Sequence, residues 1–175
     1  MASQFNYDFN KDKAVQHSNG LAHSKKVRLA QFGSFETTVK FTIAPNDTPP
    51  YDDALFFFID AAESNDTHSF SLVFDHSSDY PDSLSLGIVI DGAFEFTPVE
   101  VPIEFLGKEL TLVGSYAGNT HEIKATVTAS GSQQTVQAIS TSDLGPTLKD
   151  YVSVGLTTST TNVDVSYWAF NSTAP

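Results

Sequence analysis

Hydrophobic and polar residues alternate with a period of two over much of this 175-residue sequence. The segment 34–43, SFETTVKFTI, shows this pattern most clearly. Every second residue of the segment would share one face of an extended chain, and these residues are Phe35, Thr37, Val39, Phe41 and Ile43. Because successive side chains of a strand point to opposite sides of a sheet, the pattern predicts a half-buried β-strand.

Further strand patterns, separated by turn signals, fill the rest of the chain. The segment 54–60, ALFFFID, is a continuous apolar run and predicts a strand buried on both faces. Residues 110–140 predict three strands joined by the turns AGNT and ASGSQ, in which glycine supplies positive φ angles. Only 142–151 could hold a helical turn, which Pro146 limits. About ten short strands with regular turns predict an all-β fold, an antiparallel β-sandwich or jelly roll.

Length and composition are those of one globular domain. A chain of 175 residues can bury a sizeable core, and residues 1–175 are expected to form a single domain. Hydrophobic residues make up 40% and charged residues 17%, which is typical of a folded rather than a disordered chain. The absence of cysteine excludes disulfides, thiolate metal sites and thiolate nucleophiles.

The charge of the chain narrows the choice of partners. A formal net charge of −12 argues against nucleic acid and anionic membranes, because phosphate contacts need a basic face. Solubility or cation binding would explain the excess of acids. No apolar run is long enough to span a membrane, and the first residues lack the features of a secretory signal. Acceptor triplets at Asn46, Asn65 and Asn171 are compatible with a secreted or extracellular protein.

Five segments resemble, in the same order, segments of the legume-type (L-type) lectins. GLAHSKKVRL is similar to the family's G-R-A-L-Y-x-x-P-V-x-L. GSFETTVKFTIAPNDTPPYDDALFFFID resembles its Ser-Phe strand, Pro/Asp loop and I-A-F-F strand. SLVFDHSSD and LGIVID fall where the family has V-E-F-D-T-x-x-N and H-I-G-I-D. The tail SDLGPTLKDYVSVGLTTST, followed by VDVSYWAFNS, looks like D-L-x-x-x-L-P-x-x-V-x-V-G-[FL]-S-A-S-T followed by V-L-S-W-S-F.

This resemblance covers residues 20–172 and implies the concanavalin A-like fold of the family, with two antiparallel sheets packed face to face. It also implies a carbohydrate site on loops at one edge of the concave sheet. Glycans or glycoproteins are then the expected partners, and a homodimer formed through sheet packing is compatible with such a fold. Trp168 falls on the family's core tryptophan and is expected in the core.

The resemblance places the sugar site just before the strand 54–60. Asp53 stands where the family has an aspartate whose carboxylate accepts hydrogen bonds from two sugar hydroxyls, and charged hydrogen bonds of this kind are strong. Without the resemblance, Asp53 would be interpreted as a solvated loop acid. Ser77 replaces the family's stacking aromatic, so Tyr80 or Tyr51 is expected to stack on the sugar instead. The predicted carbohydrate-binding residues are Asp53, Ala54, Ser77, Asp79 and Tyr80.

The sequence departs from the family at the metal ligands. Val73 and Ser85 stand where the family has the Glu and His ligands of a transition metal, so no manganese is expected. The carboxylates of Asp75, Asp79 and Asp82 are the candidate ligands for calcium, a hard cation that prefers oxygen donors. The alternative is that these three residues are solvated loop acids.

Three classes of function remain after these observations. The leading hypothesis is a non-catalytic, carbohydrate-binding lectin. An enzyme is the second, because glycosidases with this architecture use two carboxylates across a cleft. Glu36, Glu95 and Glu104 lack the E-x-D-x-x-E pattern of the sandwich glucanases, so no enzyme is expected. The third is a lectin-like interaction or defence protein that has lost metal and sugar binding.

Overall fold

The computed structural model describes residues 4–7, 15–17, 20–28, 33–46, 51–61, 70–80, 82–145 and 151–173. The strands in this part of the chain are β1 (Gln4–Tyr7), β2 (Val15–His17), β3 (Gly20–Arg28), β4 (Ser34–Ile43), β5 (Asp52–Ala61), β6 (Phe70–Ser77), β7 (Ser83–Ile90), β8 (Ala93–Phe94), β9 (Val99–Pro102), β10 (Leu110–Ala117), β11 (Glu122–Ala129), β12 (Thr135–Thr141), β13 (Tyr151–Thr158) and β14 (Val163–Thr173). A 3-10 turn, η1 (Ile103–Phe105), lies between β9 and β10.

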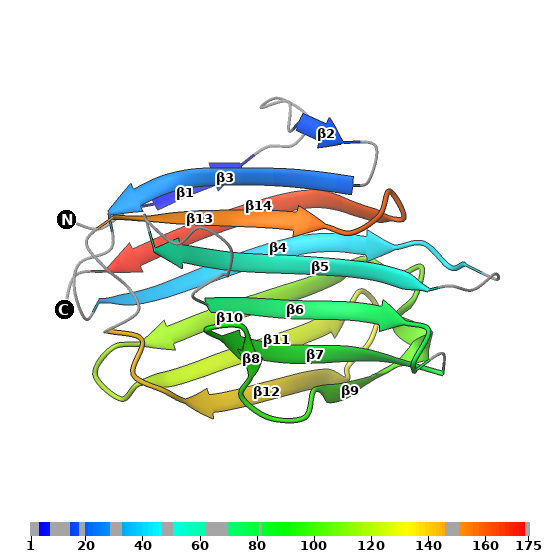
Figure 1. The fold of residues 1–175 in the computed structure, drawn as a ribbon. Coiled ribbons are helices and arrows are strands. Elements are labelled where there is room, and N and C mark those ends of the chain that lie inside the picture. Colours follow the sequence, from blue (N-terminus) through cyan, green and yellow to red (C-terminus); the bar gives the residue numbers. More distant parts are fainter. Residues whose placement is uncertain are drawn as a thin grey trace.

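These strands form two antiparallel sheets that lie face to face (Figure 1). Sheet A has the order β1-β14-β4-β10-β11-β12, and sheet B has the order β2-β3-β13-β5-β6-β7-β8, with β9 also paired to β7. The predicted all-β sandwich is confirmed. The helical turn considered at 142–151 is absent from its described part, 142–145, while residues 146–150 and Asn65 lie outside the described residues. No helix in the described part is long and apolar enough to cross a membrane.

The hydrophobic core lies between the sheets and is built from alternate residues of facing strands. The predicted alternation of β4 is confirmed, since its inward residues are at most 3% exposed. The ring of Phe35 lies 6.3 Å from that of Phe57 and 5.7 Å from that of Phe70, centroid to centroid, which joins sheet A to sheet B. Trp168 is fully buried, as expected, and its Nε1 donates a hydrogen bond to Oγ1 of Thr37 at 3.0 Å.

One end of the sandwich gathers segments that are distant in sequence. Antiparallel pairing places the start of β5 between the ends of β6 and β13, because Asp52 pairs with Ser77 and Leu55 pairs with Thr158. The β6–β7 turn and the β13–β14 turn therefore flank the start of β5, on the right of Figure 1. We call residues 51–54, 75–80, 82–83 and 158–162 the rim.

The fit between the sheets leads to a prediction about two glycines. A Cβ on Gly114 would lie 2.1 Å from Cδ1 of Leu72, a fully buried residue of the other sheet. Gly114→Ala should therefore force the sheets apart locally and destabilise the fold by about 1–3 kcal/mol. Urea denaturation followed by circular dichroism measures this loss.

Gly87→Ala is the matched control. A Cβ there would lie 2.5 Å from Cε1 of Phe94, but that ring is 54% exposed and has room to turn away. This variant should lose much less stability than Gly114→Ala. Equal losses in the two variants would contradict the packing described here.

Candidate functional site

Asp53 lies at the rim but points into the space between the sheets. It is in phase with Leu55 and Phe57, which are fully buried, and is itself 1% exposed. Its Oδ1 accepts a hydrogen bond from the hydroxyl of Thr160 and another from Nδ2 of Asn162, the latter at 3.2 Å. Asp53, the residue predicted to bind the sugar, therefore lies beneath the surface, and its hydrogen-bond donors come from the chain itself.

The β13–β14 turn, residues 159–162, is fastened to the start of β5. The backbone N–H of Ser159 donates to the carbonyl of Ala54 at 3.0 Å, and the N–H of Ala54 donates to Oγ of Ser159 at 2.7 Å. The Ser159 hydroxyl in turn donates to the carbonyl of Asp52. Within the turn, the N–H of Asn162 donates to Oγ1 of Thr160 at 3.2 Å. Ala54 is only 5% exposed, so this predicted site residue also lies beneath the turn.

His76 is a rim residue whose place beside Asp75 puts it near the expected site, although the sequence predicts no role for it. It pairs with Asp53 across β5 and β6, is 2% exposed, and stacks on Tyr51 with ring centroids 4.5 Å apart. Neither ring nitrogen of His76, nor Oδ2 of Asp53, has a hydrogen-bond partner among the described residues. Buried polar atoms are nearly always paired, so these three atoms set the interior of the rim apart from the rest of the core. His76 lies two residues after the buried Phe74, so the strand alternation is the sequence signal that predicts the burial of His76.

The exposed side of the rim carries the other predicted sugar-site residues. Oγ of Ser77 accepts the N–H of Asp79 at 3.2 Å, which shapes the β6–β7 turn. Oγ of Ser78 accepts the N–H of Tyr51 and donates to its carbonyl at 3.1 Å, which ties this turn to the start of β5. Asp79 is exposed and Tyr80 is 67% exposed. The predicted residues therefore lie at one end of the sandwich, some on its surface and some beneath it.

The three predicted calcium ligands lie on β6 and in the turn between β6 and β7. Asp75 is half-buried on β6, and its Oδ1 accepts the hydroxyl of Ser85, its partner on β7. Asp79 and Asp82 are exposed in the short turn that leads into β7. In the ranges that the structure describes, no three acidic or histidine side chains are placed to hold a metal ion. Val73 is 6% exposed, and together with Ser85 it leaves a donor set that does not fit a transition metal.

The environment of Asp75 disfavours its ionised form. Burial is the largest effect and raises the pKa of its carboxyl above the ordinary value of 3.8. The hydrogen bond from Ser85 opposes this change, the charge of Asp52 adds to it, and His76 opposes it. A carboxyl whose pKa is raised in the folded state stabilises the fold when protonated, and this contribution is lost as the pH rises.

This pKa shift predicts how Asp75→Asn changes thermal stability. At pH 3.5 the carboxyl of the wild type is mostly protonated, as the amide of the variant is neutral, so their melting temperatures should be similar. As the pH rises through the raised pKa, only the wild type has to ionise a half-buried group, so the variant should become the more stable protein and stay so at pH 7. Melting curves at pH 3.5 and pH 7 measure the difference. The same substitution at the exposed Asp164, Asp164→Asn, is the control for replacing a carboxylate by an amide.

The missing ligand set also predicts the response to calcium. Adding calcium or a chelator should leave the melting temperature unchanged, because no three acidic or histidine side chains among the described residues, Asp75, Asp79 and Asp82 included, are placed to hold a metal ion. A ligand of the folded state present at 100 times its Kd would add about 2.7 kcal/mol of stability. For a chain of this length that gain would raise the melting temperature by several degrees. Such a rise would show that these carboxylates do come together around the ion.

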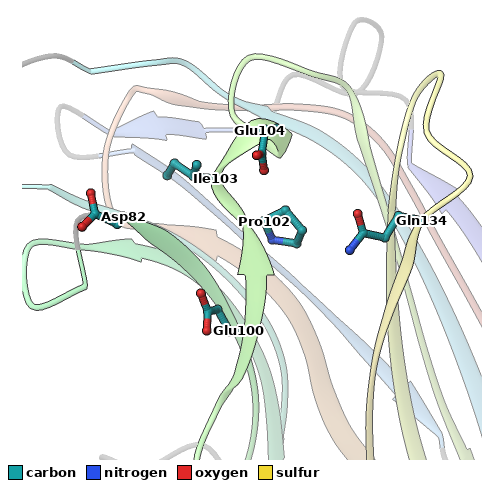
Figure 2. A pocket seen from close by; sticks show the side chains of 6 residues that line it. All are labelled: Asp82, Glu100, Pro102, Ile103, Glu104 and Gln134. Atoms are coloured by element: carbon teal, nitrogen blue, oxygen red, sulfur yellow. The ribbon is translucent and has the colours of Figure 1, made fainter.

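An acidic pocket of about 430 Å³ lies beside the rim (Figure 2). Its carboxylates come from three places, because Asp82 ends the β6–β7 turn, Glu100 is on β9 and Glu104 is in η1. Gln134, just before β12, lies on the opposite side of Pro102 from Asp82 in this view. The pocket adds negative charge at this end of the molecule, which opposes the binding of anionic ligands.

The three acids considered for catalysis lie in separate parts of the chain. Glu36 is exposed on β4 and Glu104 is exposed in η1. Glu95 follows β8, and its carboxylate accepts hydrogen bonds from the hydroxyls of Ser140 at 3.0 Å and Ser142 at 2.6 Å. These contacts give Glu95 a structural role between the two sheets.

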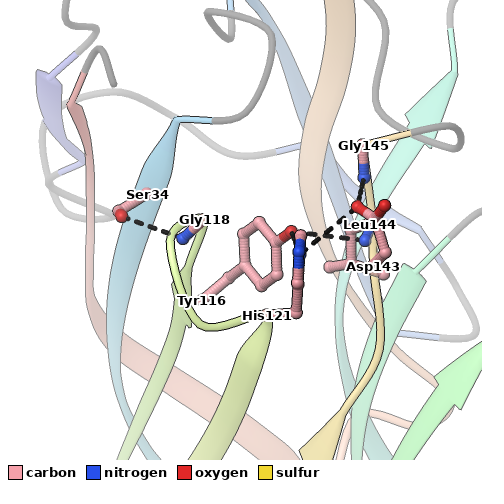
Figure 3. Close-up of polar contacts among 7 residues, drawn as sticks. All are labelled: Ser34, Tyr116, Gly118, His121, Asp143, Leu144 and Gly145. Atoms are coloured by element: carbon pink, nitrogen blue, oxygen red, sulfur yellow. Dashed lines mark hydrogen bonds and ion pairs between the residues drawn. The ribbon is translucent and has the colours of Figure 1, made fainter.

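A second polar cluster (Figure 3) lies at the opposite end of the sandwich, where β10 and β12 end on the left of Figure 1. Nδ1 of His121 is 3.2 Å from the hydroxyl of Tyr116 and 3.4 Å from Oδ1 of Asp143. The N–H of Leu144 donates to the Tyr116 hydroxyl at 3.3 Å, and the N–H of Gly145 donates to Asp143 at 2.8 Å. Burial raises the pKa of Tyr116, the bond from Leu144 opposes this, and the charge of Asp143 adds to it. Since Leu144 is fully buried, the cluster braces the segment after β12 against the β10–β11 turn.

No protein-family model and no curated protein matches this sequence. Solved structures, however, match the fold over nearly the whole chain. A lectin from Bauhinia forficata in complex with GalNAc has a TM-score of 0.76 at 16% identity, covering 99% of this chain and 99% of that chain. Lectin II from Ulex europaeus has a TM-score of 0.75 at 17% identity, covering 97% and 98%. The winged bean acidic lectin complexed with methyl-α-D-galactose has a TM-score of 0.73 at 18% identity, covering 99% of each.

The chain has the legume lectin fold. This confirms the concanavalin A-like architecture that the sequence segments imply. At 16–18% identity the likeness establishes the fold and leaves the ligand to be argued from the rim. Within the legume lectin fold of this chain, the rim combines an exposed aromatic, exposed acids and a buried carboxylate fastened to a turn.

Proposed function

We propose that this chain is a non-catalytic lectin domain that binds glycans at the exposed side of the rim. The observation that carries the proposal is the match of the whole fold to lectins, two of which were solved with galactose-type sugars. The rim supports it with groups suited to a sugar, which presents both hydroxyls and apolar C–H faces. Carboxylates accept hydrogen bonds from the hydroxyls, and an aromatic ring covers the apolar face.

Specific residues are proposed for these two roles. Tyr80 is the stacking residue, because its ring is 67% exposed while Tyr51 already stacks on His76. Asp79 and Ser77 lie in or beside the same turn and provide acceptors for hydroxyls. Asp52 is exposed next to Ser77 on the neighbouring strand and adds a second carboxylate.

The proposal of a non-catalytic role has its own support. The neighbours reported above are lectins, and the acids Glu36, Glu95 and Glu104 lie in three separate parts of the chain. A glycosidase needs two carboxyl groups facing each other across the scissile bond. An assay for released reducing sugar should therefore detect no activity on any glycan that binds.

A second candidate is a lectin-like interaction protein that binds no sugar. Two observations favour it. The carboxylate of Asp53 already has donors from within the chain, and the described residues hold no set of three metal ligands. A broad glycan array, probed with and without calcium, separates the two candidates, since a protein of the second kind binds nothing on it.

The role proposed for Tyr80 gives a direct prediction. Tyr80→Ala should weaken the binding of the best array glycan by about 2–12-fold, since an aromatic contact is worth roughly 0.5–1.5 kcal/mol. Titration calorimetry measures the change. Phe94→Ala is the matched control, because Phe94 is also an exposed aromatic but lies on β8, away from the rim. If both variants bind like wild type, the sugar does not stack on Tyr80.

A further inference from the structure

We propose that Asp53 is a positioning residue of the rim, which holds the β13–β14 turn in place from below without touching the sugar. The inference rests on the proposed glycan binding and names how one residue of that site acts. It replaces the direct contact with sugar hydroxyls that the legume lectin resemblance implies for Asp53. Three features of the rim lead to it.

The first feature is the access to the carboxylate. Asp53 is 1% exposed, and its Oδ1 already accepts a hydroxyl from Thr160 and an amide N–H from Asn162. Its Oδ2 is buried as well. A sugar hydroxyl would bring the same kind of donor that Thr160 already provides, and it would have to displace the turn to reach the oxygen.

The second feature is the way the turn depends on Asp53. Thr160 uses its hydroxyl twice, because it donates to Asp53 and accepts the N–H of Asn162 at 3.2 Å. Asn162 uses its side-chain amide for Asp53 and its carbonyl for the N–H of Ala44 at 2.9 Å. The carboxylate thus joins two turn residues to β5, and its removal would leave both side chains without this acceptor.

The third feature is the unequal use of the two carboxylate oxygens by the described residues. Oδ2 has no hydrogen-bond partner among the described residues, and His76 on the next strand offers no bond to it. An ionised carboxylate in such a place is costly to bury. An asparagine would keep the accepting oxygen and remove the charge, so it should serve the turn as well as aspartate does.

The experiment compares Asp53→Asn, Asp53→Ala and Thr160→Val with the wild type. Glycan affinity is measured by calorimetry with the best array glycan, and amide hydrogen exchange of residues 159–162 is measured without glycan. Asp53→Asn should bind within about threefold of wild type, a change of less than 1 kcal/mol, and keep its amide protection. Asp53→Ala should weaken binding by about tenfold or more and speed the exchange of Ser159, whose N–H bonds to Ala54.

Thr160→Val tests the same link without altering the carboxylate, which matters if Asp53→Ala does not fold. It should resemble Asp53→Ala in both measurements. Thr161→Val is the matched control at the exposed tip of the turn and should change neither.

Two outcomes would overturn the inference. If Asp53→Asn loses glycan binding while its turn exchanges as in wild type, the carboxylate contacts the sugar. If Asp53→Ala and Thr160→Val both exchange as in wild type, the carboxylate does not hold the turn. A wild type that binds no glycan would remove the proposed function alone, because the exchange measurement still decides whether Asp53 positions the turn.

Discussion

The aromatic packing of Phe35 between the two sheets is the contact on which the other features depend. Its ring lies 5.7 Å from Phe70 and 6.3 Å from Phe57 of sheet B, and 5.8 Å from Tyr116 and 6.0 Å from Phe170 of sheet A, measured between centroids. Interlocked rings leave little freedom for one sheet to slide over the other. Since the rim consists of strand ends of sheet B together with the turn that leads into β14 of sheet A, its shape follows from this alignment.

Strand alternation continues to act at the rim, where it separates two kinds of chemistry. Side chains in phase with the core, Asp53 and His76, are carried inward, while Asp52 and Ser77, one position out of phase, face away from it. The buried pair is therefore available for holding the chain together, and the outward residues and the β6–β7 turn are available to a ligand. The strands supply the scaffold and the turns supply the exposed groups, a division common among binding proteins.

Most of the fold could be predicted from the sequence because the hydrophobic pattern of each strand is set by neighbouring residues. The alternation of β4 predicts which of its residues face the core, the apolar run of β5 predicts burial on both faces, and the structure agrees with both. The same parity applied to Asp53, in phase with Leu55, would also have predicted its burial. The bond from Thr160 to Asp53 joins residues 107 positions apart, so no local pattern could predict it. The hydrogen bond from the hydroxyl of Ser85 to the carboxylate of Asp75 was not predicted either, because it depends on the register in which β6 pairs with β7.

The position of Glu95 has a consequence for the behaviour of the protein at high concentration. The strand β12, TVQAIST, is an edge of sheet A, carries no charge and exposes Ile139 by 51%. Uncharged edges of this kind are templates for fibril growth. The N–H of Glu95 donates to Ile88 of sheet B at 3.0 Å, while its carboxylate binds Ser140 and Ser142 at the far end of β12. One acid thus bridges the two sheets at this side of the sandwich and sets a carboxylate beside an edge strand that carries no charge of its own, and charged side chains at an edge disfavour edge-to-edge pairing of strands.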